Sequence, residues 1–218
     1  KRLNEPPWNQ AVTRDQTTVL GWNGAGGTPG LFVGFANYED ALAAGGAVRQ
    51  YAAGQPQVSD AIAATPSSAG PLAMADYDGD GPLDFFVGGR SLPGRYPEPA
   101  QSQLWRQQGG RWVLDAENTG QLVNVGMVSG AVWTDLDGDG WPELVLACEW
   151  GPVRVFHNDR GRLRETTAEL GLAAYLGWWN GVTTADFDGD GRLDILASNW
   201  GLNTEYRATK ESPCRLYY

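Results

Sequence analysis

The sequence contains the stretch Asp76-Tyr77-Asp78-Gly79-Asp80-Gly81-Pro82-Leu83-Asp84, in which four of the nine side chains are carboxylates. The same pattern, D-x-D-G-D-G-x-x-[D/E], recurs at residues 135–143 (DLDGDGWPE) and 186–194 (DFDGDGRLD). We call these segments loop 1, loop 2 and loop 3. Together they hold twelve of the 26 acidic residues, which leaves 14 acidic against 16 basic residues elsewhere. The formal net charge of −10 therefore originates in the three loops.

The spacing of the acids within each loop is typical of a cation-binding turn. Four carboxylates this close together repel one another unless a positive charge lies between them. The acids at positions 1, 3 and 5 can curve around one point, while glycine at position 6 permits the sharp turn. The backbone carbonyl of position 7 and the acid of position 9 complete the predicted ligand set. The predicted ligands are Asp76, Asp78, Asp80, Pro82, Asp84, Asp135, Asp137, Asp139, Trp141, Glu143, Asp186, Asp188, Asp190, Arg192 and Asp194.

Oxygen donors in this number favour Ca²⁺, which takes about 6–8 oxygen ligands in loose geometry. Mg²⁺ needs a stricter octahedron, and zinc or copper would prefer His or Cys ligands. An EF-hand would require a bidentate Glu at position 12, where this chain has Val87, Leu146 and Ala197. Asp-Gly turns without metal are the remaining alternative. We expect about three Ca²⁺ ions, one in each loop.

The loops belong to a larger internal repeat. A short apolar segment enters each loop and another leaves it, as in residues 70–75 and 85–87 around loop 1. Further strand-like segments follow at 103–106 and 111–114, and the same order recurs around loop 2. Each unit therefore reads strand, metal loop, strand, strand, turn, strand. A first copy without acids (strands at 17–21, 31–34 and 48–51, with 22–27 in the loop position) should bind no metal.

Four-stranded units at this spacing predict an all-β fold, a β-propeller built from four-stranded antiparallel blades. The whole chain, 1–218, is read as one propeller domain or propeller fragment. Its units are roughly 11–58, 59–118, 119–170 and 171–218, and residues 214–218 are expected to form the third strand of the last unit. Either the N-terminal residues close a four-bladed ring, or the chain is part of a larger propeller with open blade edges.

The three loops and their flanking strands resemble the FG-GAP/VCBS repeat family, the integrin-α-like propellers. Residues 177–181 (GWWNG) and 199–204 (NWGLNT) further resemble the ASPIC/UnbV-type members of that group. The resemblance implies calcium in each intact loop and an extracellular, cell-surface or periplasmic location. It also implies adhesion or ligand binding more often than catalysis.

Several residues outside the loops are candidates for other chemistry. His157, the single histidine, is expected to be structural or solvent-facing. The pair Cys148 and Cys214 is compatible with a disulfide or with two free thiols. The glycines of residues 24–27 lack the lysine and helix of a nucleotide-binding loop. A sugar-stacking platform could consist of Trp178, Trp179 and Trp200, and the alternative is that these rings pack between blades. The catalytic candidates, which share no recognisable spacing, are Arg90, Arg95, Tyr96 and Glu149.

The leading functional prediction is a calcium-binding, non-catalytic module for extracellular or surface protein or carbohydrate binding, in which the metal is structural. The alternative is a polysaccharide-active lyase or hydrolase that uses the propeller as a scaffold. A third interpretation is self-association through open blade edges. The acidity argues against nucleic acid as a partner, and the absence of any run of 18 apolar residues argues against membrane insertion.

Overall fold

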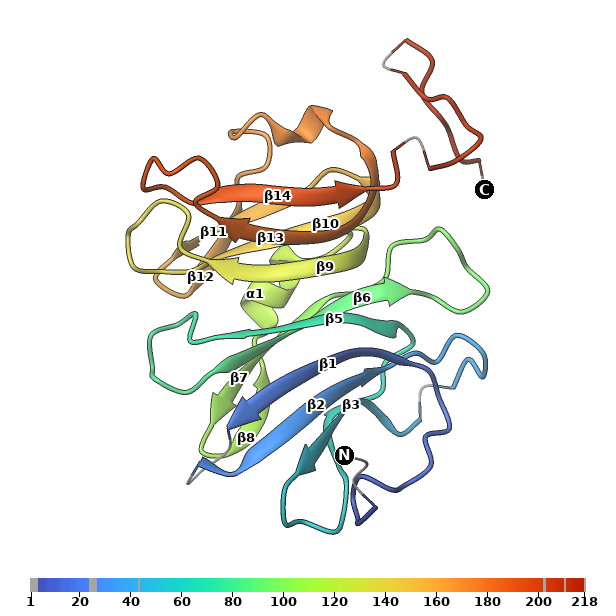
Figure 1. The fold of residues 1–218 in the computed structure, drawn as a ribbon, viewed down its shortest axis with the longest axis vertical. Coiled ribbons are helices and arrows are strands. Elements are labelled where there is room, and N and C mark those ends of the chain that lie inside the picture. Colours follow the sequence, from blue (N-terminus) through green and yellow to red (C-terminus); the bar gives the residue numbers. More distant parts are fainter. Residues whose placement is uncertain (1–3, 24–26, 43, 202, 210, 218) are drawn as a thin grey trace.

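The computed structural model describes residues 4–23, 27–42, 44–201, 203–209 and 211–217, and it is built from antiparallel β-sheets (Figure 1). The first sheet has the order β1 (Gln16–Asn23), β2 (Pro29–Phe35), β3 (Gly46–Ala52), β4 (Ser59–Ala63). The second has β5 (Ser68–Ala75), β6 (Asp84–Ser91), β7 (Gln103–Gln108), β8 (Arg111–Leu114). The third has β9 (Met127–Thr134), β10 (Glu143–Gly151), β11 (Arg154–Asp159), β12 (Arg162–Glu165). A last pair, β13 (Gly177–Ala185) and β14 (Asp194–Asn199), is hydrogen-bonded to the end of β10 at Glu149–Trp178 and Gly151–Gly177, so the third sheet has six strands when this pair is included.

The predicted all-β class and the antiparallel four-stranded sheets are confirmed. Each predicted order of strand, loop and three further strands is found around loops 1 and 2. The first unit differs at its end, because β4 pairs with β3 and carries the first sheet to residue 63, past the expected boundary after residue 58. Two short helices accompany the sheets: α1 (Ala116–Gln121) and a 3₁₀ turn at Leu172–Ala174.

The strand expected at 214–218 is wrong for the residues that are described. Residues 214–217 pair with no strand and are exposed, and they belong to a segment that extends away from the sheets (Figure 1). Tyr218 lies outside the described residues, as do residues 24–26 of the expected acid-free loop. Without a neighbouring strand, the apolar side chains of this segment have nothing to pack against.

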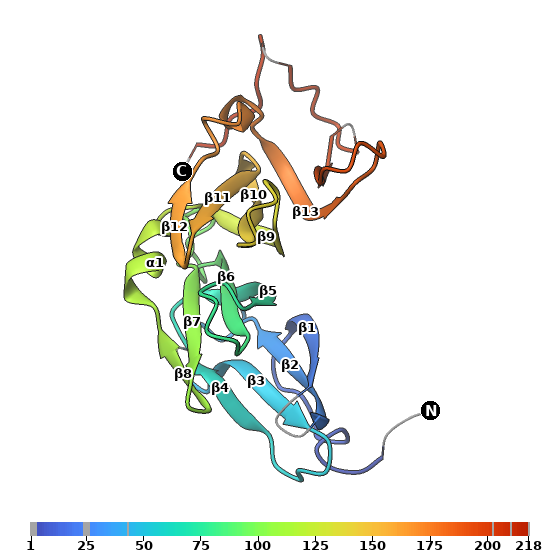
Figure 2. The ribbon, with the colours of Figure 1, turned by 90° about the vertical axis from the view of Figure 1, so that its left-hand side faces the viewer.

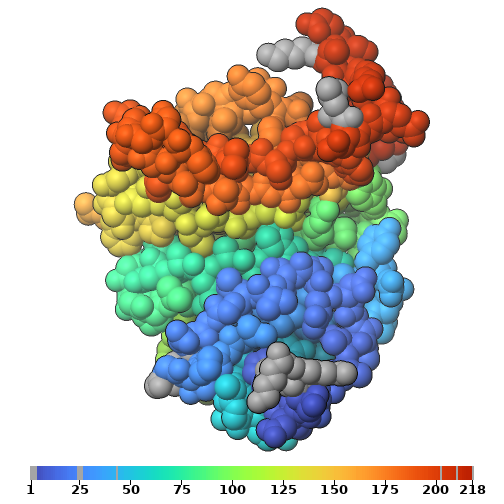
Figure 3. Space-filling model, viewed as in Figure 1, coloured from blue at the N-terminus to red at the C-terminus, as the bar shows by residue number. Residues whose placement is uncertain are grey.

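The sheets stack face to face in chain order along the long axis of the molecule (Figures 2 and 3). The alternation of side chains explains the stacking, because successive residues of a strand face opposite sides of its sheet. In β10, Leu144 and Leu146 face the second sheet, whereas Val145 faces the β13–β14 pair. In β6, Phe85 faces the first sheet and Phe86 faces the third. Each interior sheet therefore contributes to two apolar layers.

The first strands of the units, β1, β5, β9 and β13, lie next to one another (Figure 1). Glycine permits this approach. A Cβ atom on Gly130 of β9 would lie 2.8 Å from the Cα atom of Gly181 in β13. A Cβ atom on Gly70 of β5 would lie 2.8 Å from the carbonyl oxygen of Val128 in β9. The first and last sheets lie at opposite ends of this row, so the described residues do not close a four-bladed ring (Figure 1).

Candidate metal centres

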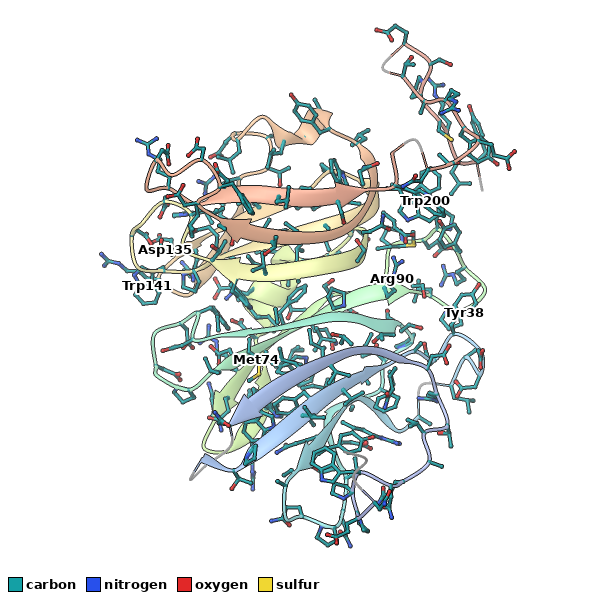
Figure 4. All side chains as sticks on the ribbon, viewed as in Figure 1. Tyr38, Met74, Arg90, Asp135, Trp141 and Trp200 are labelled. Carbon is teal, nitrogen blue, oxygen red and sulfur yellow. The ribbon has the colours of Figure 1, made fainter. Side chains whose placement is uncertain are left out.

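The three acidic loops connect the first and second strands of their units. Loop 1 joins β5 to β6, loop 2 joins β9 to β10 and loop 3 joins β13 to β14. The acid at position 9 is in each case the first residue of the second strand. All three loops therefore lie at the same end of the stacked sheets, the end marked by Asp135 and Trp141 in Figure 4.

The loops share one backbone conformation. The glycines at positions 4 and 6 have positive φ angles in every copy, for example 74° at Gly79 and 101° at Gly81. The amide of the position 6 glycine donates to the position 1 aspartate at 3.0 Å in loops 1 and 2 and at 2.9 Å in loop 3. The amide of position 5 donates to the position 3 aspartate at 3.2, 3.2 and 3.1 Å. Side chains at other positions differ, so the motif itself sets this conformation.

The carboxylates of positions 1, 3 and 9 gather in each loop. In every copy, one oxygen from each of the three acids lies within 4.8 Å of the other two. The three groups are Asp76, Asp78 and Asp84 in loop 1, Asp135, Asp137 and Glu143 in loop 2, and Asp186, Asp188 and Asp194 in loop 3. Such a cluster of negative oxygens offers the hard ligands that divalent cations prefer.

Two carboxylate oxygens of loop 1 are buried without a hydrogen-bond partner: Asp76 Oδ1 and Asp84 Oδ2. The other oxygen of Asp84 accepts the amide of Gln107 at 3.0 Å. The Asp84 residue as a whole is 1% exposed. A buried carboxylate oxygen without a hydrogen-bond donor costs free energy, and a cation between these two atoms would offset that cost.

Burial also changes the acidity of the position 9 side chains. Burial, with added repulsion from Asp78, Asp80 and Asp76, raises the pKa of Asp84 to about 7 despite the donor from Gln107. Burial likewise raises the pKa of Glu143, although the amides of Leu136 and Asn158 act in the opposite direction. A dication beside these groups would favour their ionised forms and reverse both shifts.

The predicted ligands at positions 5 and 7 are placed differently. Asp80 and Asp190 are not members of a gathered carboxylate group, whereas Asp139 gathers with Asp137 and His157. The carboxylates of Asp139 and Asp190 each accept the amide of position 7, Trp141 or Arg192, at 2.8 Å. Pro82 has no amide and makes no such bond. The indole of Trp141 lies against Gly79, so loop 2 contacts loop 1.

The third strand of each complete sheet contributes a side chain that was not predicted to lie at a loop. Arg106 of β7 lies 3.5 Å from Asp78, and His157 of β11 lies 3.4 Å from Asp137. The two residues occupy the same register, because each follows the partner of the first apolar residue after its loop. The alignment of residues 103–106 with 154–157, which places Arg106 and His157 at equivalent positions, is the sequence signal from which these contacts could have been predicted. The expectation that His157 is merely structural or solvent-facing did not anticipate this contact.

A buried polar side chain connects loops 1 and 2. The amide group of Asn158 donates to the carbonyl of Tyr77 at 2.9 Å and to that of Pro142 at 3.0 Å. Its oxygen accepts the amide of Gly161 at 2.7 Å. The Tyr77 ring stacks on Trp133 of β9, with ring centroids 5.5 Å apart. The loops are thus fixed relative to each other by the packing of adjacent sheets.

The model of the FG-GAP-like repeat matches one span that begins at the first aspartate of loop 2, passes through loop 3 and ends in β14. Residues 135–197 match the FG-GAP-like repeat. The FG-GAP-type resemblance inferred from the acidic motif is therefore confirmed for this span, and the ASPIC/UnbV subtype is not tested by it. No curated protein matches the chain. Among the described residues, none of the helices is long and apolar enough to cross a membrane.

The opposite end of the FG-GAP-like sheets carries an aromatic cluster. Trp178 contacts Trp150, with ring centroids 5.2 Å apart, and Trp200, at 4.3 Å. Trp179 is not part of this cluster, because it packs in the apolar layer between the third sheet and β13–β14. The sequence analysis did not include Trp150, which has a φ of 57° that only the surrounding structure can maintain. Figure 4 shows Trp200 at this end of the strands, away from Asp135.

Three of the four catalytic candidates lie beside this aromatic cluster. Arg90 forms an ion pair with the buried carboxylate of Glu149. The hydroxyl of Tyr96 accepts the indole N–H of Trp150 at 2.7 Å. Arg95 does not join them, and pairs instead with Glu98.

Cys148 is buried and Cys214 exposed, and both thiols are free.

Proposed function

We propose that this chain is a calcium-stabilised, propeller-type binding module. The unpartnered buried oxygens of Asp76 and Asp84, in a loop geometry that occurs three times, are the observation that carries the proposal. In each loop the carboxylates of positions 1, 3 and 9 would hold the ion. Position 5 and the position 7 carbonyl would complete an oxygen shell of the size that Ca²⁺ takes, about 6–8 ligands.

The proposed role of the metal is structural. Each loop connects two strands of one sheet, and its acids lie close enough to repel one another strongly where water is scarce. A bound dication would cancel that repulsion and hold the strand ends together. Because the ion would bind the folded state only, each site would add stability according to the concentration of free calcium.

Equivalent residues of successive sheets support propeller-type stacking. Phe86 and Val145 are fully buried by the sheet that follows each of them, whereas Leu196, the same position of β14, is 56% exposed. Tyr77 at position 2 of loop 1 is also fully buried, whereas Phe187 at the same position of loop 3 is 56% exposed. We therefore propose that a further four-stranded sheet of the same type packs on the outer face of β13–β14.

The proposed ligand surface is the aromatic end, opposite the acidic loops. Trp200 is 41% exposed beside Trp178, and the Arg90–Glu149 pair lies close to Trp150 through Tyr96. Flat aromatic rings next to charged hydrogen-bonding groups suit carbohydrate or protein ligands. FG-GAP repeats are typical of extracellular or surface proteins, so we place this binding outside the cytoplasm.

The gathering of Arg90, Tyr96 and Glu149 keeps a polysaccharide-active enzyme as the second candidate function. A screen of glycans for both binding and cleavage separates a binding module from an enzyme.

The calcium proposal is tested by thermal unfolding in chelator and in millimolar calcium. At a hundredfold excess of calcium over Kd we expect about 2.7 kcal/mol of added stability per site. Asp188→Ala in loop 3 should lose one site's share of this gain, and Asp188→Asn should behave alike because the charge is lost. Glu205→Ala, which removes an exposed acid outside the loops, is the matched control. Identical melting with and without calcium would refute the proposal.

A further inference from the structure

Loop 2 differs from the other two loops by one side chain from the neighbouring strand. His157 of β11 faces loop 2, whereas the same register of β7 brings Arg106 to loop 1. Loop 3 has no third strand beside it within the described residues. A guanidinium has no lone pair to offer to a metal, but a neutral imidazole nitrogen does. Loop 2 is therefore the acidic loop with a nitrogen ligand within reach.

The imidazole of His157 has carboxylate oxygens of loop 2 close to it on more than one side. His157 Nδ1 lies 3.4 Å from Asp137 Oδ2 and 3.2 Å from Glu143 Oε1. Asp139 contributes a further oxygen, which lies within 4.8 Å of the chosen atoms of Asp137 and His157. The four groups come from the loop, from the first residue of β10 and from β11, so three separate segments supply them.

The separations between the imidazole and the two carboxylates are also those of ligands around a metal ion. A charge-assisted N–H···O bond is typically about 2.7–2.9 Å long, which is shorter than either distance to His157. Zinc binds imidazole nitrogen and carboxylate oxygen at about 2.0–2.2 Å, so ligands at the corners of a tetrahedron around it are about 3.4 Å apart. The distances from His157 Nδ1 to Asp137 and to Glu143 match this spacing.

The buried member of the cluster has spare capacity. Glu143 is 2% exposed, and its Oε2 atom accepts the amide of Leu136 at 2.8 Å. Its Oε1 atom faces His157 and has one backbone donor, the amide of Asn158, at 3.4 Å, which is a long and weak bond. A buried carboxylate oxygen with so little support from the backbone is aimed at the imidazole. By contrast, Arg106 at loop 1 donates hydrogen bonds to Tyr77 and Asp115.

We propose that loop 2 binds a borderline divalent transition-metal ion, Zn²⁺ being the representative, in place of calcium. The ligands are His157 Nδ1, Asp137 and Glu143. Asp139, which gathers with Asp137 and His157, is a further oxygen donor beside them. An imidazole among carboxylates shifts the preference of a site from calcium towards such ions. This inference rests on the proposed cation site of loop 2 and assigns that site a metal different from those of loops 1 and 3.

The test counts both metals on one untagged protein. The exposed free thiol of Cys214 is a competing zinc ligand, so Cys214→Ser is the starting background. Equilibrium dialysis against calcium alone should give three ions per chain, which tests the proposed function. Dialysis against both metals should give one zinc and two calcium ions. His157→Gln should abolish zinc binding and leave three calcium ions, and Asp188→Asn in loop 3 should lose one calcium ion and keep the zinc.

The imidazole gives an independent reading of the same site. His157 is the single histidine of the chain, so its ring signals in ¹H–¹⁵N spectra are unambiguous. Zinc should shift Nδ1 strongly, and calcium should not. Three bound calcium ions together with zinc binding that persists in His157→Gln, or with an unshifted Nδ1, would overturn the inference and leave the calcium proposal intact. Zinc bound through His157 in a protein that binds no calcium would support this inference and refute the calcium proposal.

Discussion

Position 9 of the acidic loop shows what one residue contributes to these sites. Asp84 and Glu143 begin the second strands of their sheets, and both are almost completely buried. A strand start is normally a place where a charged side chain can turn to solvent. Here the backbone directs each carboxylate inward, beneath the loop and beside two other acids. Burial of these two carboxylates costs free energy, and a cation beside them would offset that cost.

The first prediction concerns the pH dependence of the metal-free protein. The pKa of Asp84 is about 7 in the folded chain and 3.8 in its ordinary state, so between these values the folded state holds a proton that the unfolded state has lost. Stability in chelator should therefore fall by roughly a few kcal/mol as pH rises from about 4 to about 7. Denaturant titrations at several pH values measure this. In Asp84→Asn the decline should be much smaller, and in calcium it should vanish or reverse.

The second prediction concerns Asn158. Asn158→Ala removes the bonds to Tyr77, Pro142 and Gly161 and leaves their buried backbone groups unpaired. Unfolding in urea should show a loss of about 2–4 kcal/mol. Asn203→Ala, an exposed position, should be nearly neutral. Equal stability of the two variants would show that the link between loops 1 and 2 contributes nothing.

At the scale of the elements, the acidic motif and the alternation of apolar residues predicted most of the strands. Residues 85–87, 144–146 and 195–197 all lie in strands, because alternate burial is a local property that the sequence carries. The failures have a different cause. The side chains of Arg106 and His157 reach the loops from a strand that is distant in sequence, and Trp150 and Trp178 meet only through the pairing of β10 with β13. Such contacts depend on register, which single-sequence patterns do not define.

The third prediction tests the contact between first strands. In Gly130→Ala, the new methyl group would lie 2.8 Å from the backbone of Gly181, and backbone cannot rotate away as a side chain can. Separating β9 from β13 should cost about 1–3 kcal/mol. The matched control is Gly120→Ala in α1, where a methyl group meets nothing within 4 Å and alanine favours the helix. Thermal unfolding of both variants decides the matter, and a Gly130→Ala protein as stable as the control would contradict the proposed close approach.

At the scale of the whole molecule, the row of sheets ends in an uncovered apolar face. Leu196 and Phe187 occupy positions that are covered in the preceding units. The sequence indicated repeated units, but the exposure of this face became visible only when equivalent positions could be compared in three dimensions. An exposed face of this kind is a site for association.

The fourth prediction follows from that face. At high concentration the chain should self-associate, and Leu196→Lys should shift it towards the monomer by placing a charge on the contact surface. Leu170→Lys, a substitution of a residue 54% exposed in the turn after β12, is the control and should leave association unchanged. Light scattering over a concentration series measures both. A chain that is monomeric at all concentrations would show that the face does not bind another copy.

The serial arrangement of the sheets also has a consequence for local opening. Amide hydrogens of β10 are enclosed by apolar layers on both sides, whereas those of β14 have a layer on one side only. Separation of the terminal hairpin would expose a single interface, but freeing β10 would break two. Deuterium should therefore enter β14 first and β10 last, and a protease should cut the chain progressively inward from this end.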